Sequence, residues 1–183
     1  MKTTITEALA DIKTSQARIV KKRAAVNVYL GRDSRIRDPL EGEGGSPEFI
    51  RRELQGIMDL EKKIVAIRSA IQKANLETTL DIEGASRTLS AWLNWRREIA
   101  DAHKGFLAQM AQQIDNLRKQ AVSRGQPVVA AAIASINSDA AVGELIVNVS
   151  EKELREEIEQ MENVLGQLDG KLSLLNATTT IEI

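Results

Sequence analysis

The sequence predicts a mainly α fold, in which long antiparallel helices form a bundle or coiled coil with short β-strands at its periphery. Three observations lead to this prediction. Apolar residues recur at steps of three and four over long stretches, the spacing of one helix face. Two Trp, one Tyr and two Phe stand against many Ala, Leu and Ile, which favours helix-on-helix packing over a β-sandwich. Short alternating, β-branched segments interrupt or follow the helices. We expect one domain of 183 residues.

The first half of the chain predicts two helices joined by a loop. Helix 1 is expected over about 3–30, and the Gly, Pro and Asp content of 31–46 predicts a loop. Helix 2 is expected over about 47–76, with Ser46 as N-cap and Pro47 at the first helical position. The apolar stripe of helix 1 is expected to face a partner helix. The apolar stripes are Ile5, Leu9, Ile12, Ile19, Val26 and Leu30 in helix 1, and Ile50, Leu54, Ile57, Leu60, Ile64, Ile67 and Ile71 in helix 2.

The middle of the chain predicts a strand, a third helix and an insertion. The alternation in "TTLDIEG" predicts a short strand near 78–83. Helix 3 is expected over about 87–122. The neutral, Ala-rich segment 125–143 is expected to be a weak helix or an ordered loop that adds a contact surface. The apolar stripe of helix 3 is Leu89, Trp92, Leu93, Ile99, Phe106, Met110, Ile114 and Leu117.

Residues 144–183 predict a strand–helix–strand unit. The strands are expected near 144–149 and 178–183, and Ser150 with Glu153 predicts a capping box at the start of the helix. A helix of about 26 residues is roughly 39 Å long, so the two strands should lie at its opposite ends and not pair together. We expect the final strand to pair with the "TTLDIEG" segment or with a neighbouring subunit.

We expect the contacts with other copies or partner proteins to come from three groups of residues. The C-terminal helix carries a heptad repeat, which predicts a coiled-coil seam. Trp92 and Trp95 lie one turn apart in helix 3, where a core or subunit interface is a better interpretation than base stacking. The terminal strand supplies the third group. The candidate interface residues are Leu154, Ile158, Met161, Leu165, Leu168, Leu172, Leu175, Trp92, Trp95, Thr178, Thr180, Ile181 and Ile183.

The side chains that most often carry catalysis or bind metals are scarce. The chain has no Cys and one His, so thiolate sites and paired-histidine metal sites are excluded. The segment "GQLDGKLS" at 166–173 looks like a phosphate loop, but its spacing is one residue short and it lies within the heptad helix. We therefore expect no enzymatic activity, no cofactor and no catalytic or metal-binding residues.

Charge is distributed unevenly, although the net charge is −1. Residues 1–37 hold nine Lys or Arg and three acids, whereas residues 139–183 hold ten acids and three Lys or Arg. We expect the two ends to attract each other within one bundle or between subunits packed head to tail. The basic run "KKR" at 21–23 is expected to be a solvated helix face, so nucleic acid is not an expected partner.

The sequence shows no segment that targets or anchors the chain in a membrane. The N-terminal segment breaks its apolar positions with charges every few residues, unlike a signal peptide. The longest uncharged stretch, 125–138, is too short to span a bilayer. We expect the protein in the host cytoplasm or in a virion, not secreted by a signal peptide.

The chain ends with a strand, a helix that contains the pair Leu168–Asp169, and Asn176 followed by a short Thr-rich tail, and it carries the acidic, Pro-containing loop "DPLEGEGGSPEF". Over most of the chain, these features resemble the septicolysin-like family of small helical proteins. Two departures are Ala177, where the family has an aromatic residue, and the additional segment 125–143. The resemblance implies helical hairpins packed in an oligomeric bundle, with no catalytic residue to carry over. The matching positions are Asn75, Thr78, Thr79, Gly84, Thr88, Leu89, Arg96, Arg97, Val147, Val149, Leu154, Leu168, Asp169, Asn176, Thr178 and Thr179.

Together, these features predict a non-enzymatic, homo-oligomeric helical protein that builds or stabilises a larger assembly. The most concrete setting is a bacteriophage virion, as a capsid-stabilising or head–tail component. The heptad seam, the opposite charges of the ends and the terminal strand motivate this hypothesis. Two alternatives remain open: a free cytosolic helical bundle with a binding role, and a septicolysin-like cytolysin.

Overall fold

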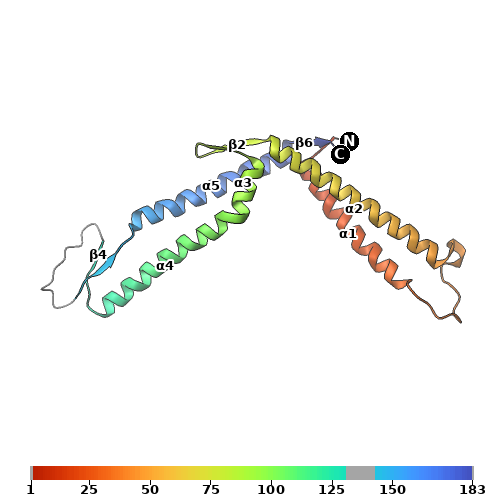
Figure 1. The fold of residues 1–183 in the computed structure, drawn as a ribbon, viewed down its shortest axis with the longest axis horizontal. Coiled ribbons are helices and arrows are strands. Elements are labelled where there is room, and N and C mark those ends of the chain that lie inside the picture. Colours follow the sequence, from red (N-terminus) through yellow and green to blue (C-terminus); the bar gives the residue numbers. More distant parts are fainter. Residues whose placement is uncertain (1, 131–142, 183) are drawn as a thin grey trace. The chain divides into compact units, whose positions relative to one another are not determined.

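A computed structural model describes residues 2–130 and 143–182 and confirms a mainly α fold (Figure 1). Four long helices dominate it, and the strands are three or four residues long. The chain groups into two compact units: 1–78 with 171–183, and 79–170. Each unit is described by itself below. The sequence predicts a single domain, and that remains a prediction.

The first unit is built on a hairpin of α1 (Ile5–Val28) and α2 (Gly45–Glu77). Both helices occur where the sequence predicts them, to within two or three residues. Figure 1 shows them side by side and antiparallel. The far end of the hairpin is closed by Tyr29 against Phe49, whose ring centroids are 5.0 Å apart.

The buried face of α1 differs in part from the predicted stripe. Leu9 and Leu30 are exposed, so their assignment to the face that packs against a partner helix was wrong. Ala8 and Ser15 take the alternate core positions instead. These small side chains allow α2 to approach α1 closely. In the sequence they do not stand out as core positions, because neither is a large apolar residue. The buried residues of α1 are Ile5, Ala8, Ile12, Ser15, Ile19 and Val26, a regular repeat of three and four.

The loop before α2 is ordered by Asp38. Its carboxylate accepts hydrogen bonds from the Ser46 backbone N–H at 2.8 Å, the Ser46 hydroxyl at 2.7 Å and the Leu40 N–H at 2.9 Å. These bonds hold the pKa of Asp38 below its ordinary value, the Ser46 backbone bond contributing most. After the short η1 (Glu41–Glu43), α2 starts from Gly44, whose φ is +95°, so the predicted cap at Ser46 was two residues late.

The C-terminal strand β6 (Thr180–Glu182) pairs antiparallel with β1 (Lys2–Thr4), with Thr3 opposite Ile181. The predicted partner "TTLDIEG" was therefore wrong. Ile181 packs with Ile5, Ala8, Ile12 and Ile67 in the core of this unit. The tail is thus held inside its own chain, at the start of α1, where Thr4 and Glu7 form a capping box.

The second unit begins with a hairpin of β2 (Thr79–Ile82) and β3 (Ala85–Thr88). The strand predicted near 78–83 is confirmed, and its partner is the segment that follows it. The two turn residues, Glu83 and Gly84, both have positive φ, 50° and 75°, as a two-residue hairpin turn requires.

The predicted helix 3 is one continuous helical stretch with a π-helical turn inside it. It consists of α3 (Leu89–Trp95), the π-helical η2 (Arg96–Ala100) and α4 (Asp101–Ser123). A π turn holds about one extra residue, so it rotates the following helix relative to α3. The buried positions of α4 are therefore not those of an uninterrupted helix.

The buried face from the end of the π turn onward differs in part from the predicted apolar stripe. Ala100 and Leu107 are buried, whereas the neighbouring Ile99 and Phe106 are exposed. Leu117 is exposed as well, while Ile114 of the stripe is buried. The buried residues after the π turn are Ala100, Leu107, Ile114 and Ala121, at a spacing of seven.

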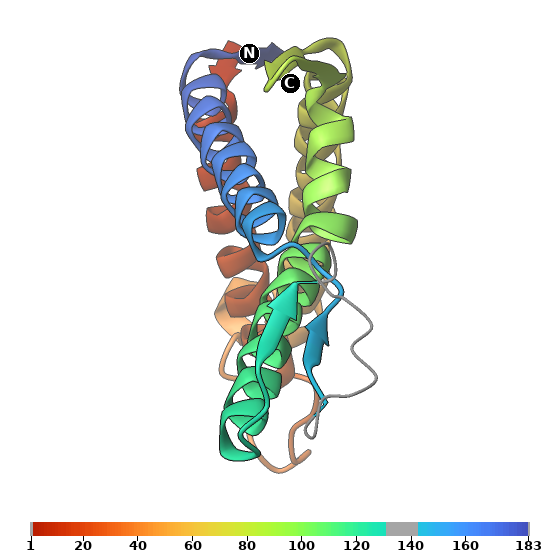
Figure 2. The same cartoon turned by 90° about the vertical axis from the view of Figure 1, so that its left-hand side faces the viewer.

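The remainder of this unit is a parallel strand pair and the first part of α5 (Glu151–Thr178). The strand predicted near 144–149 occurs as β5 (Leu145–Val147) and pairs with β4 (Val128–Ala130), beside α4 and α5 in Figure 2. The weak helix or ordered loop predicted for 125–143 thus contains a strand, and residues 131–142 lie outside the described part. Leu107, Ile114, Val147 and Leu154 form the core of the unit.

Candidate interaction surfaces

The heptad seam of α5 lies largely against its own chain. Leu154 packs in the cluster with Leu107 and Ile114 of α4, and Ile158 packs on that cluster. Leu168 is fully buried, and the other four residues of the seam are half-buried: Met161, Leu165, Leu172 and Leu175. The seam is therefore a packing face inside the chain. A role for it between copies remains a prediction.

Ion pairs flank the contact between α4 and α5. His103 Nε2 lies 3.2 Å from Glu157 Oε1, and Lys104 Nζ lies 2.8 Å from Glu162 Oε1. Arg118 pairs with Glu151 at the far end. Several acids of the C-terminal helix are thus paired with bases of α4.

Bases of α1 are paired in the same way with α2. Lys22 lies 2.9 Å from Glu53 and Arg23 lies 2.8 Å from Glu61. Between the two ends of the chain, Lys2 and Glu182 pair across β1 and β6 at 3.6 Å. Of the predicted attraction between the two ends, this exposed pair is the contribution of the terminal strands, and the helical charges named above pair with neighbouring helices instead.

The tryptophan pair serves the packing of the second unit. Trp92 is buried, its Nε1–H donates to the Leu80 carbonyl at 3.2 Å, and the Arg87 guanidinium lies 5.0 Å from its ring centroid. Trp95 is half-buried and meets Trp92 edge to face at 5.5 Å. These contacts anchor the β2–β3 hairpin on α3, as expected for a core role.

The predicted interface residues of the tail divide by environment. Ile181 is buried, and Thr180 beside it is exposed. The exposed Thr178 donates its hydroxyl to the Leu174 carbonyl at 2.9 Å. Ile183 lies outside the described residues. The apolar side chain of β6, Ile181, therefore faces the core of its own chain.

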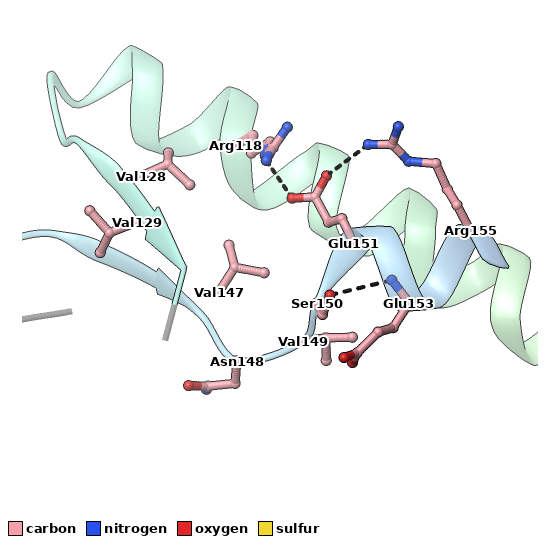
Figure 3. Close-up of a pocket in the computed structure, with 10 residues that line it drawn as sticks. All are labelled: Arg118, Val128, Val129, Val147, Asn148, Val149, Ser150, Glu151, Glu153 and Arg155. Carbon is pink, nitrogen blue, oxygen red and sulfur yellow. Dashed lines mark hydrogen bonds and ion pairs between the residues drawn. The ribbon is translucent and has the colours of Figure 1, made fainter. Parts of the chain in front are cut away.

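A hollow of about 630 Å³ opens where β4 and β5 meet the first turn of α5 (Figure 3). Valines, including Val128 and Val147, form one wall. On the other wall the Glu151 carboxylate pairs with Arg118 and, at 3.7 Å, with Arg155. The acidic first turn of α5 opposes anion binding at this helix N-terminus.

One half of the predicted capping box is present beside this hollow. The Ser150 hydroxyl accepts the Glu153 N–H at 3.3 Å (Figure 3). The cap therefore satisfies a backbone donor at the start of α5.

Within residues 2–130 and 143–182, His, Asp and Glu side chains form no group suited to a metal ion. Among these residues, no helix is long and apolar enough to cross a bilayer.

A second apolar stripe runs along the outer side of α2. We call Leu54, Met58, Val65 and Leu76 the outer stripe of α2; all four are about half exposed or more. At 3.6 residues per turn they fall within about 40° of one another around the helix. Leu54 belongs to the predicted apolar repeat of helix 2 but is 48% exposed. Its spacing of eleven from Val65, and of eleven again to Leu76, is the signal that could have identified this stripe.

Another exposed stripe lies on α4 and the π turn. We call Ile99, Phe106 and Leu117 the outer stripe of α4. Phe106 is 57% exposed, unusual for such a large apolar side chain. The π turn generates this surface, because it turns Ala100 and Leu107 inward in place of Ile99 and Phe106.

Comparison with known proteins gives no relative: no family model, curated protein or solved structure matches this chain. The resemblance to the septicolysin-like family therefore remains an expectation from the sequence.

Proposed function

We propose that the chain is a non-enzymatic, homo-oligomeric helical protein that builds or stabilises a larger assembly. The observation that carries this proposal is the pair of outer stripes on α2 and α4. In each unit the inner helix faces are used by contacts within the chain. The outer stripes present aligned apolar side chains that remain exposed.

Aligned apolar residues on a helix have a specific physical meaning. Single exposed apolar residues are normal on soluble proteins, but contiguous patches mark surfaces that bind other macromolecules. A helix that presents residues at turn spacing binds a second helix along its length. Long helical hairpins with two such faces are suited to repeated self-association, and less suited to enclosing a small substrate.

The most concrete setting that we propose is a bacteriophage virion, in a capsid-stabilising or head–tail role. The partners would be further copies of the chain and other proteins of the particle, with no small-molecule substrate. Quantitative mass spectrometry of purified particles from infected cells tests this setting. A constant number of copies per particle supports it, and absence of the protein from particles would rule it out.

Self-association is tested by sedimentation velocity over a wide concentration range. The wild-type chain should sediment as an oligomer, and Phe106→Glu should shift it toward smaller species. Ala108→Glu is the matched control, because Ala108 is an exposed residue of the same helix outside the stripe. A monomeric wild-type chain at every concentration would contradict the proposal.

A further inference from the structure

We infer that the outer stripe of α2 binds the same stripe of a second copy, antiparallel, about a two-fold axis at Val65. The inference rests on the proposed self-association and adds its surface, orientation and register. Three features of α2 lead to it: the spacing of the stripe, a hollow beside its centre, and the charges along one flank.

Three residues of the stripe, Leu54, Val65 and Leu76, are spaced symmetrically about Val65. Leu54 precedes Val65 by eleven residues and Leu76 follows it by eleven. Eleven residues are close to three full turns, about 16 Å along the helix, so all three point in nearly the same direction. An antiparallel pair with its axis at Val65 places Leu54 of each copy against Leu76 of the other, and Val65 against itself. Such self-complementarity is the condition for a two-fold interface.

A hollow next to Val65 can receive a side chain of the second copy. It measures about 460 Å³ and is lined by Met58, Glu61, Lys62, Val65 and Ala66. The hollow lies beside the two-fold axis. The symmetry therefore places the hollow of each copy near Val65 of the other copy. The flexible Met58 can fill the space that remains.

The charges select the antiparallel orientation. Glu61 and Arg68 are seven residues apart and therefore lie on the same flank of the stripe. In an antiparallel two-fold pair the same flanks meet, so Glu61 of each copy lies beside Arg68 of the other, within about one residue of perfect register. In a parallel two-fold pair opposite flanks meet, so Glu61 and Arg68 of the two copies would not face each other.

These residues are available for such contacts. Glu61 is 47% exposed at its side chain even while it pairs with Arg23 at 2.8 Å, and a carboxylate can accept from two guanidinium groups. Arg68 is exposed. The stripe can therefore associate without rearrangement of the α1–α2 core.

Disulfide trapping tests the orientation directly, because the chain has no Cys of its own. Leu54→Cys and Leu76→Cys chains are prepared separately, one isotope-labelled, then mixed and oxidised. The mixture should yield disulfide dimers that join the two variants, and neither variant alone should cross-link. In the antiparallel pair the two copies of residue 54 lie about 33 Å apart, far beyond the roughly 7 Å that a disulfide spans. Cross-linking of Leu54→Cys with itself would overturn the inference.

A matched pair of charge substitutions tests the surface. Val65 is 64% exposed on α2 and Val20 is 65% exposed on α1, so Val65→Glu and Val20→Glu should perturb the monomer equally. The two-fold axis introduces the charge twice at the centre of the interface, so Val65→Glu should raise the dissociation constant on the order of a hundredfold. Val20→Glu should leave it within about threefold.

The outcomes separate this inference from the proposed function. A wild-type chain that is monomeric throughout would remove both. An oligomeric wild-type chain that Val65→Glu leaves unchanged, with helix content retained, would overturn the α2 interface and leave self-association standing.

Discussion

Replacing Ile181 by Ala should destabilise the first unit strongly, although Ile181 stands two residues from the end of the chain. Its side chain is 5% exposed and packs with Ile5, Ala8, Ile12 and Ile67. Buried Ile-to-Ala substitutions cost about 2–5 kcal/mol. A short terminal strand can relax around the cavity, so we expect the lower half of that range, about 2–3 kcal/mol.

Urea unfolding followed by far-UV circular dichroism measures this cost. With an m-value of about 2 kcal/mol per molar urea, the midpoint should fall by about 1 M. Glu182→Ala is the matched control in the same strand. It removes an exposed pair with Lys2 at 3.6 Å, so the cost should stay under about 1 kcal/mol.

Hydrogen exchange locates the effect. In Ile181→Ala, the amides of α1 near Ile5–Ile12 should exchange faster than in the control, because β6 and Ile181 cover the start of that helix. Equal midpoints for both variants, together with a smaller oligomer for Ile181→Ala, would refute the reasoning and place the tail on a neighbouring subunit.

Three further outcomes are expected. Deleting Glu98 in the π turn should convert η2 to α-helix and lower the free energy of unfolding by less than about 1 kcal/mol. Deleting Gln109 should lower it by at least about 3 kcal/mol in thermal unfolding, because this deletion rotates Ile114 and Ala121 out of the core. Equal losses for the two deletions would contradict the assignment of the π turn. The lowered pKa of Asp38 means that its carboxylate stabilises the folded loop above about pH 4 and loses this effect as the pH falls below that value. The Leu40 and Ser46 amides should therefore lose protection from hydrogen exchange in acid, and Asp38→Asn should abolish this pH dependence. Acid sensitivity that persists in Asp38→Asn would show that another group causes it. Arg68→Glu should weaken self-association by placing like charges on one flank of the α2 pair. The charge swap Glu61→Arg with Arg68→Glu should restore it when Arg23→Glu is added, because Arg23 pairs with Glu61 in the same chain. No recovery in the sedimentation profile would argue against that register.

The helices and their limits were predictable because long apolar repeats carry strong signals. Leu154 to Leu168 repeat over consecutive heptads, and this face is buried or half-buried. The inner face of α1 was only partly predicted, because Ala8 and Ser15 occupy core positions that a search for large apolar residues passes over. The apolar pattern favours Leu9 over its neighbour Ala8, because Leu9 has the larger apolar side chain.

The π turn and the strand pairing could not be predicted from local patterns. Nothing in "RREIA" distinguishes a π turn from an α-helix, yet that turn decides whether Ile99 or Ala100 faces the core. β1 is three residues long and merges with the start of α1, so the sequence gives little sign of a strand there. Pairing of β1 with β6 depends on the ends of the chain meeting in space, which local sequence does not encode.

The predicted interface residues show the same limit. The seam of α5 and Trp92 were predicted as contact residues from their apolar spacing, and they do make contacts, inside the chain. Spacing identifies a face that must be covered, but it does not tell which helix covers it. The outer stripes became visible only when burial separated Leu54 and Phe106 from the core.

Self-association through the outer stripes can be tested by sedimentation velocity of the wild-type chain beside a Val65→Glu, Phe106→Glu double variant. We expect a wild-type species that is a multiple of the 20.1 kDa chain and a folded double variant at 20.1 kDa. A wild-type chain that sediments at 20.1 kDa across the whole concentration range would contradict it.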